Sequence, residues 1–498
     1  MRADLPSATD VVVVGAGFGG LATALRLSEL GARVVLCEAL DYPGGCASTF
    51  SRGGCRFESG ATLFSGFGRG QLFDRWVERY GIDTTIDWLD PVVELRTPSI
   101  RIPVSRRRER FVASLASLPG APRESIYGFF DRQRRVADLL WSLVDEPDLM
   151  PPFGLSAAWR HALRARDYLS LLPLLGISLQ SVLRRHLVSG FSPLRIYLEA
   201  LCQITVQCPP EEAEALLALG AMDYYFRGTG HVRGGIGKLA EGLADAIRSL
   251  GGAVSMANHV TNLKRANGRW LVSTRRGDIE SGIVVANVLP HGLRELTGRS
   301  GDELKAADDL ARRVESGWGA CMLYRVARRP AGVPVGPHHL QLIRDPSVPF
   351  VEGNHVFCSF SGELDGDRAP EGYGTCTVST HVPVSKLARM SLREQRAYVE
   401  TVHASMRETL ERLAPEWEEA VLEEMTASPR TFQRFTKRFL GYVGGIPRRV
   451  GLAHYRALAP RPLLSGLYLV GDTVFPGQST LATAIGGYKL ADHIARRT

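Results

Sequence analysis

The stretch VVVVGAGFGGLATAL, Val11–Leu25, decides the fold. Its four valines are typical of a buried parallel strand, and the Ala- and Leu-rich residues at its end are typical of a helix. Between them, Gly15, Gly17 and Gly20 form the pattern G-x-G-x-x-G. The first glycine permits a tight turn, the second lets a pyrophosphate approach the backbone, and the third lets the helix pack on the strand. The stretch therefore predicts a dinucleotide site at a helix N-terminus.

The residues that follow complete this unit. Gly31 ends the predicted helix, RVVLCE (33–38) predicts a second strand, and Glu38 closes that strand 18 residues after Gly20. A carboxylate at this position accepts hydrogen bonds from ribose hydroxyls and repels a 2′-phosphate. An ordinary glycine turn between packed elements is the alternative, but it does not explain the acid.

A second glycine turn favours FAD over NAD. Gly44 and Gly45 lie in YPGGCASTF (42–50), directly after the second strand, and CRFESGATLFSG (55–66) comes next. An NAD-type unit normally runs into a crossover helix at this point. Flavoproteins of the glutathione-reductase type instead carry an extra loop toward the flavin, and the sequence resembles them here. An ordinary surface turn is the alternative for the two glycines.

A further glycine-rich segment, GDTVFPGQSTLATAIGG, occupies residues 471–487. Asp472 follows the predicted strand GLYLV (466–470) and can accept hydrogen bonds from ribityl hydroxyls. The Pro-Gly turn after it starts a helix near Ser479, whose positive end would point at N1 and the C2 carbonyl of a flavin. One elongated cofactor thus accounts for both glycine-rich segments.

Length and composition bound the remaining possibilities. A chain of 498 residues predicts two domains, and 45% hydrophobic with 22% charged residues is typical of a globular protein. The formal charge of +8 fits a solvated surface or an anionic membrane equally well, and no nucleic-acid partner is expected. The eight cysteines show no C-x2-C pair, so no metal site is expected and a reduced, cytoplasmic setting is favoured.

Two segments leave alternatives open. Tyr168–Leu183 is an apolar run that is too short to span a bilayer, with arginines on both sides. It fits either a segment in the lipid headgroup layer or a buried core helix. The Arg106–Arg110 cluster is interpreted as a solvated turn, with contact to an anionic surface as the alternative.

The middle of the chain contains no second dinucleotide loop. Residues 88–228 show helix-like patterns, 231–290 predict a glycine turn, an amphipathic helix and strands, and 297–426 predict a mixed sheet with helices. Electrons must therefore pass to or from the substrate, oxygen, a quinone or another diffusible partner.

Taken with TASPRTFQRFTKRFLGYVGGIPRR (426–449) and GLYLVGDTVFPGQSTLATAIGGYKLADHI (466–494), these motifs resemble the carotenoid desaturase and isomerase superfamily, whose relatives include retinol saturase. PRT (429–431) and GDTVFPGQ (471–478) are most similar to carotenoid isomerases and late-pathway desaturases. The resemblance covers most of the chain, although only the cofactor motifs are specific. Ser48-Thr49-Phe50 and the run after Gln478 depart from the close relatives, which bears on the substrate.

The resemblance implies an α/β fold: a discontinuous FAD-binding Rossmann domain of the glutathione-reductase type with an inserted mixed α+β substrate domain. The expected FAD domain comprises residues 8–87, 229–296 and 427–498, and the substrate domain comprises 88–228 and 297–426. It also implies an apolar substrate tunnel and a cytoplasmic protein attached peripherally to a membrane.

The expected cofactor-binding residues are those at the motif positions and their immediate neighbours. They are Gly15, Gly17, Phe18, Gly19, Gly20, Glu38, Ala39, Gly44, Gly45, Cys46, Ala47, Gly60, Ala61, Thr62, Val260, Asn287, Gly471, Asp472, Pro476, Gly477, Gln478, Ser479 and Thr480. The flavin itself is expected to carry the chemistry. Glu58, Arg430, Arg434 and Lys437 are weaker polar candidates, with ordinary surface charge as the alternative.

The activity implied is an FAD-dependent oxidoreductase that desaturates, isomerises or saturates a long polyene or isoprenoid. Two alternatives stay open. A flavin amine oxidase shares these cofactor loops, but PGQST (476–480) lacks the cysteine that often links the flavin in that group. A non-catalytic, FAD-stabilised lipid-binding protein is the third interpretation.

Overall fold

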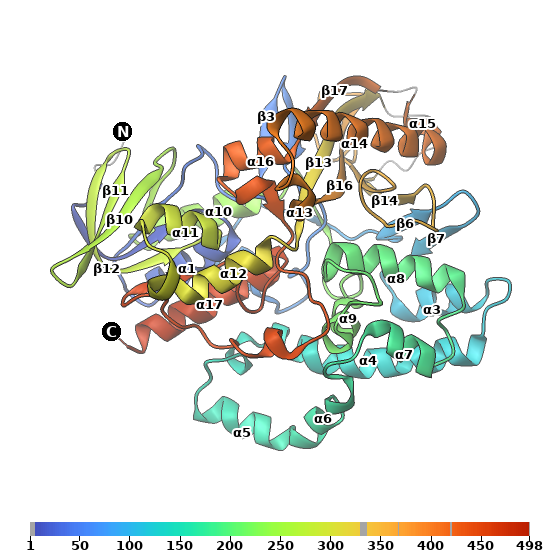
Figure 1. Ribbon diagram of the computed structural model, residues 1–498, viewed down its shortest axis with the longest axis horizontal. Helices are drawn as coiled ribbons and strands as arrows, with labels where there is room; N and C mark the ends of the chain where they lie inside the picture. Colours follow the sequence, from blue (N-terminus) through green and yellow to red (C-terminus); the bar gives the residue numbers. More distant parts are fainter. Residues whose placement is uncertain (1–4, 329–335, 367, 419–420, 498) are drawn as a thin grey trace.

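The computed structural model describes residues 5–328, 336–366, 368–418 and 421–497. Within them, two large β-sheets and a group of helices make up the molecule (Figure 1). The first and last helices, α1 (Phe18–Glu29) and α17 (Thr480–Ala495), pack side by side against the first sheet. The amino- and carboxy-terminal segments therefore share one layer.

The first sheet has seven strands in the described residues, in the order β10-β11-β12-β1-β2-β9, with β19 also paired to β12. These are β1 (Ala8–Val14), β2 (Val34–Cys37), β9 (Ala253–Ser255), β10 (Val260–Ala266), β11 (Arg269–Thr274), β12 (Gly277–Ala286) and β19 (Leu467–Leu469). The predicted valine strand is confirmed as β1, in parallel pairing with β2 and β12.

The valines of β1 are buried on both faces of the sheet. Val11 and Val13 pack with α1, α17 and α10 (Gly237–Ser249). Val12 and Val14 pack on the opposite face, with α11 (Pro290–Thr297) and α12 (Lys305–Val314). A parallel strand covered on both sides requires a continuous apolar run, which explains the four valines.

Among the residues that the structure describes, the second sheet has eight strands, in the order β17-β13-β16-β15-β14-β6-β7, with β18 also paired to β13. These are β6 (Val93–Arg96), β7 (Arg101–Val104), β13 (Trp318–Arg328), β14 (His338–Ile343), β15 (His355–Phe360), β16 (Tyr373–Pro383), β17 (Val421–Ala427) and β18 (Tyr442–Val443). The helix-like interpretation of 88–228 is wrong for β6 and β7, because β6 pairs in parallel with β14 and so extends this sheet. The exact domain boundaries stay a prediction.

Smaller elements surround the two sheets. They are the hairpin β3 (Thr49–Arg52) and β4 (Cys55–Glu58), the pair β5 (Ile86–Asp87) and β8 (His231–Val232), and the helices α2 (Leu72–Tyr80), α13 (Val384–Leu387), α14 (Leu392–Leu413), α15 (Pro415–Glu418) and α16 (Pro429–Thr436). The helix expected from LREQRAYVETVHASMRETLERL is confirmed as α14.

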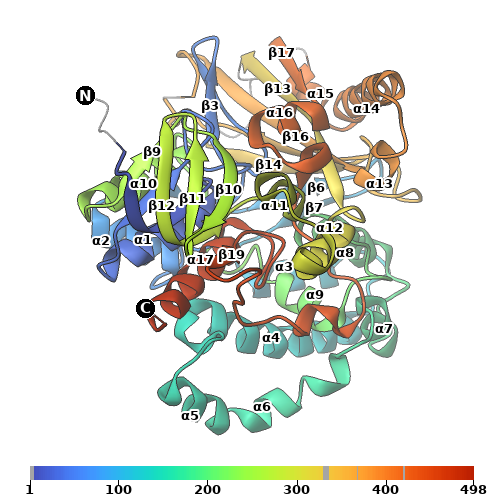
Figure 2. The same ribbon diagram turned by 60° about the vertical axis from the view of Figure 1, so that its left-hand side comes forward.

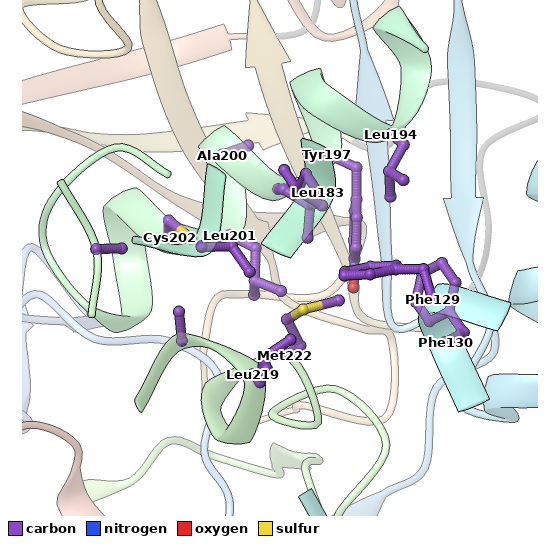
Figure 3. Close-up of a cluster of buried hydrophobic side chains, with 14 of the residues drawn as sticks. Phe129, Phe130, Leu183, Leu194, Tyr197, Ala200, Leu201, Cys202, Leu219 and Met222 are labelled. Atoms are coloured by element: carbon purple, nitrogen blue, oxygen red, sulfur yellow. The ribbon is translucent and has the colours of Figure 1, made fainter. Parts of the chain in front are cut away.

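A separate group of helices packs below the second sheet in the view of Figure 1. They are α3 (Arg108–Ala116), α4 (Arg123–Asp145), α5 (Leu155–Leu163), α6 (Ala165–Leu169), α7 (Leu179–Arg185), α8 (Ser192–Thr205) and α9 (Ala215–Ala221). Figure 3 shows side chains of α4, α7, α8 and α9 gathered in one apolar cluster, among them Phe129, Leu183 and Leu219.

Two interpretations of arginine-rich segments need correction here. Tyr168–Leu183 is not one helix, because α6 ends at Leu169 and α7 begins at Leu179. Pro173 and Gly176, which has a φ of +74°, lie in the break, and neither favours a continuous helix. The Arg106–Arg110 cluster is not simply a solvated turn, since Arg108 begins α3 and forms an ion pair with the buried side chain of Asp223.

A substitution at Gly20 tests the close packing of α1 on β1. A Cβ at this position would overlap the carbonyl oxygen of Gly15, so we expect Gly20→Ala to destabilise the fold by about 2–3 kcal/mol. Gly128→Ala is the matched control in α4, because nothing lies within 4 Å of its added Cβ. That change should stabilise the protein by about 0.5–1 kcal/mol. Urea unfolding measures both, and equal midpoints would contradict this packing.

Candidate flavin and substrate site

The first glycine loop has the geometry expected of a phosphate cradle. Gly15 has a φ of +97°, which favours glycine, and its N–H donates to the Cys37 carbonyl at 2.7 Å. Gly17 is the N-cap of α1, so the first N–H groups of that helix face the loop. At the second turn, a Cβ on Gly45 would lie 3.4 Å from the Cα of Gly17, so the two glycine turns pack directly together. The cradle fits a pyrophosphate.

Asn287 joins this loop to the last strand of the first sheet. Its side-chain amide is satisfied when the oxygen accepts from the Gly17 N–H at 3.1 Å and the nitrogen donates to the Val470 carbonyl at 3.3 Å. Its backbone N–H donates to the Val14 carbonyl at 2.8 Å. Asn287 thus fixes residue 471, which follows Val470, beside the start of α1.

Glu38 lies buried at the end of β2. Its carboxylate accepts from the Ala16 N–H at 2.6 Å and the Leu40 N–H at 2.9 Å. Burial raises the pKa of this carboxyl group, although the backbone donors oppose that effect. A carboxylate can accept more hydrogen bonds than these two, so Glu38 keeps acceptor capacity for a ribose.

One cavity of about 1090 Å³ collects almost all of the expected cofactor residues. Gly20 and Gly477 are not in its lining, and the lining members are Gly15, Gly17, Phe18, Gly19, Glu38, Ala39, Gly44, Gly45, Cys46, Ala47, Gly60, Ala61, Thr62, Val260, Asn287, Gly471, Asp472, Pro476, Gln478, Ser479 and Thr480. The cavity therefore connects segments from both ends of the chain. This volume and its glycine-lined turns fit an elongated dinucleotide.

The weaker polar candidates are mostly elsewhere. Lys437 lines the cavity, but Glu58, Arg430 and Arg434 do not. Glu58 is buried at the N-terminus of α10, where it accepts from the Ile236 N–H at 3.0 Å and from Thr49 Oγ1 at 2.8 Å. Its geometry is that of a structural cap.

Arg438 is a lining residue that sequence reasoning missed. Its Nη2 donates to Asp472 Oδ2 at 2.6 Å, and its Nε donates to the Tyr442 carbonyl at 2.7 Å. Burial alone would lower the pKa of Arg438, but Asp472 raises it, so the guanidinium stays charged. The acid expected to meet the ribityl chain thus carries a cationic partner. No local pattern in the sequence indicates this pairing.

The far end of the cavity is largely apolar. One wall is the second sheet, where Ala320 pairs with His381, and Met322 with Ser379, so that these side chains share a face. Burial lowers the pKa of His381 to about 4, so its imidazole is neutral at pH 7. The opposite wall comes from helices, and it includes Trp141, Leu149, Met150, Phe153, Ile204, Leu216 and Ala221.

The arm formed by α5 and α6 borders this end of the cavity. His161 and Tyr168 line the cavity, and the imidazole Nε2 lies 2.8 Å from the Leu149 carbonyl while Nδ1 lies 2.8 Å from the Tyr168 hydroxyl. Since a carbonyl only accepts, Nε2 carries the proton and Nδ1 accepts from tyrosine. The bond to Leu149 ties α5 to the end of the preceding segment, and the bond to Tyr168 ties α5 to α6 within the arm.

The comparisons with known proteins agree with this geometry. A profile of the family described as NAD(P)-binding Rossmann-like domain matches residues 13–80. The chain is 24% identical to the chloroplastic prolycopene isomerase of Arabidopsis thaliana, over 98% of this chain and 82% of that protein. It is 25% identical to a neurosporene-forming phytoene desaturase of Cereibacter sphaeroides, over 94% and 90% of the two chains.

Among solved structures, putrescine oxidase bound to putrescine superposes with a TM-score of 0.64 at 16% identity, over 98% of this chain and 99% of that one. This likeness shows the fold. The sequence relatives, taken with the Rossmann-like match, indicate an oxidoreductase with a flavin-type cofactor, as predicted. The sequence relatives fit the carotenoid desaturase and isomerase superfamily, and the predicted resemblance is confirmed.

Cys46 gives a direct test of where the flavin binds. It lines the cavity, and burial raises the pKa of its thiol. We expect flavin loading to slow modification of Cys46 by N-ethylmaleimide about tenfold or more, because the cofactor covers the sulfur. Peptide mass spectrometry of apo- and holoprotein measures the rate. Cys358, which is buried away from the cavity, is the control and should react equally slowly in both forms.

Proposed function

We propose that this protein binds FAD and uses it to desaturate, isomerise or saturate a long apolar polyene of the carotenoid type. The observation that carries the proposal is one continuous cavity with two different ends. One end has glycine turns and a buried carboxylate, as a dinucleotide requires, and the other is largely apolar. Flavin supplies hydride-transfer chemistry next to a substrate that has no acidic proton.

The residues at the first end would hold the cofactor along its length. In this proposal the pyrophosphate lies over the Gly15–Gly20 loop and the N-terminus of α1, and Glu38 accepts from the ribose. The ring lies between Gly60–Thr62 and the turn that precedes α17. Ser479 is the N-cap of α17, and its Oγ accepts from the Ala482 N–H at 3.0 Å, which orders the helix end near the ring.

The apolar end would align the polyene and exclude water. Exclusion of water matters because a polyene that carries transient charge would otherwise be trapped by solvent. Electrons released by desaturation would pass to oxygen, a quinone or another diffusible acceptor, and isomerisation needs no net transfer.

The lining of the cavity argues against an amine substrate. Among the described lining residues the acids are Glu38, Glu295 and Asp472. Glu38 and Glu295 border the Val260 end that would hold adenosine, and Asp472 is paired with Arg438. A diamine cation in the apolar end would therefore lack the carboxylate that a desolvated ammonium requires.

Anaerobic incubation of the purified holoprotein tests the activity. Phytoene, poly-cis lycopene and retinol are each supplied with oxidised and with reduced flavin, and products are separated by chromatography and weighed by mass spectrometry. Loss of two hydrogens identifies desaturation, gain of two identifies saturation, and a shifted retention time at unchanged mass identifies isomerisation. Putrescine is supplied in a parallel incubation under air, because peroxide forms only when oxygen reoxidises the reduced flavin. Peroxide release from putrescine with no polyene turnover would overturn the proposal.

We also propose that the α5–α6 arm contacts a membrane. No helix in the described ranges combines the length and apolarity that a membrane span requires. On α5, Leu155, Trp159 and Leu163 follow one another at a spacing of four residues and are 92%, 67% and 69% exposed. The arm stands away from the rest of the chain in Figures 1 and 2. An exposed apolar face at the mouth of an apolar cavity fits uptake of substrate from lipid.

Removing this apolar face should release the protein from lipid. We expect Leu155→Ser/Trp159→Ser/Leu163→Ser to lower partitioning onto phosphatidylcholine/phosphatidylglycerol vesicles by about tenfold or more, because each side chain contributes on the order of 1 kcal/mol. Vesicle co-sedimentation measures this. The matched control replaces Leu364, Leu392 and Leu422, which are 69%, 58% and 54% exposed on other elements. Equal loss in both triple variants would refute a role for the arm.

A further inference from the structure

A half-buried arginine, Arg448, contacts the turn that precedes α17. Arg448 Nη2 donates to the Pro476 carbonyl at 2.6 Å. Gly477 has a φ of +108°, and the guanidinium of Arg448 occupies the space that a Cβ on Gly477 would need. The turn and the arginine are therefore fitted to each other, which explains the glycine at 477.

Within the described ranges, no carboxylate pairs with the charge of Arg448. Its Nη1 lies 3.3 Å from His454 Nδ1, and Arg313 Nη2 lies 3.0 Å from the same nitrogen. His454 Nε2 donates to the Arg449 carbonyl at 2.9 Å, so Nδ1 is the acceptor for both guanidinium groups. In the part of the chain that the structure describes, neither arginine forms an ion pair.

The titration of these groups agrees with the geometry. Burial, together with a smaller effect of the nearby Arg313, lowers the pKa of Arg448 to about 10. Burial and Arg448 lower the pKa of His454 to about 4, so the imidazole stays neutral at physiological pH. Asp472 is already paired with Arg438. This region therefore holds an excess of positive charge.

Partly buried cations without a counter-ion destabilise the fold, because they lose hydration that no carboxylate replaces. Such a cost is offset when a ligand brings a negative charge to the same place. In the proposed function, the turn at 476–478 borders the end of the flavin where the reduced ring carries its negative charge. Neither arginine lines the cavity, and Arg448 contacts the turn at the Pro476 carbonyl, so its charge acts through the turn.

We propose that Arg448, with Arg313 behind it through His454, is a positioning residue that holds the Pro476–Gly477 turn and stabilises the reduced, anionic flavin. This inference rests on the FAD site of the proposed function. It concerns the midpoint potential of the bound cofactor, and it applies equally to desaturation, isomerisation and saturation.

The test uses purified holoprotein and readouts other than turnover. The midpoint potential of the bound flavin is measured by dye equilibration, and the affinity for sulfite, whose flavin adduct is anionic, by absorbance titration. For Arg448→Met we expect the preference for reduced over oxidised flavin to fall about tenfold, equal to about 30 mV for a two-electron couple. Sulfite affinity should fall by a similar factor. Arg448→Lys keeps the positive charge but lacks the planar guanidinium group, so the midpoint potential should shift less than in Arg448→Met.

The neighbouring arginine supplies the matched control. Arg449 forms an ion pair with Glu212 at 2.6 Å, and its head group also contacts Ser316 at the surface. Arg449→Met should leave both readouts unchanged. If Arg448→Met does not fold, Arg313→Met tests the same charge from its half-exposed side chain and should shift the potential in the same direction by a smaller amount.

The outcomes separate this inference from the proposed function. An unchanged or more positive potential in both Arg448→Met and Arg313→Met overturns the inference, even where wild-type protein converts a polyene. A more negative potential supports it, even where no polyene is converted. A wild-type chain that binds no flavin overturns both.

Discussion

The arrangement of the whole molecule depends on the contact that Asn287 makes between two distant backbone segments. Its amide links Gly17, at the start of α1, to Val470, at the end of β19. A Cβ on Gly487 would overlap the carbonyl of Gly19, so α17 crosses α1 with their backbones in close approach. Only small residues allow this packing. The cavity exists because these contacts bring residues 15–20 and 471–480 to one edge of the first sheet.

The parts that local sequence chemistry dictates were predictable. A run of four valines, three glycines at fixed spacing and an acid after the next strand specify β1, the loop, α1 and Glu38, because each residue acts on its immediate neighbours. The start of α17 was predictable for the same reason, since Ser479 caps the helix that follows it. The site residues themselves stay a prediction, although most line one cavity.

The rest depends on partners that are far away in sequence. The interpretation of residues 101–104 as helical was wrong because β7 is stabilised by pairing with β6, which itself pairs with β14. Arg438 and Arg448 received no role from the sequence, because the groups they contact, Asp472 and Pro476, come 34 and 28 residues later. Long-range pairing of this kind leaves no periodic signal in the sequence.

The cofactor site is built from two segments that are far apart in sequence, so the absorbance of a bound flavin depends on correct folding of both. Segments from the two ends of the chain must both be in place before the cavity is complete, so a partly folded chain has no complete site for a chromophore. A ligand that binds only the complete site also stabilises the folded state, because binding shifts the folding equilibrium toward that state. The absorbance of bound flavin will then report that α1, Asn287 and α17 are in place together.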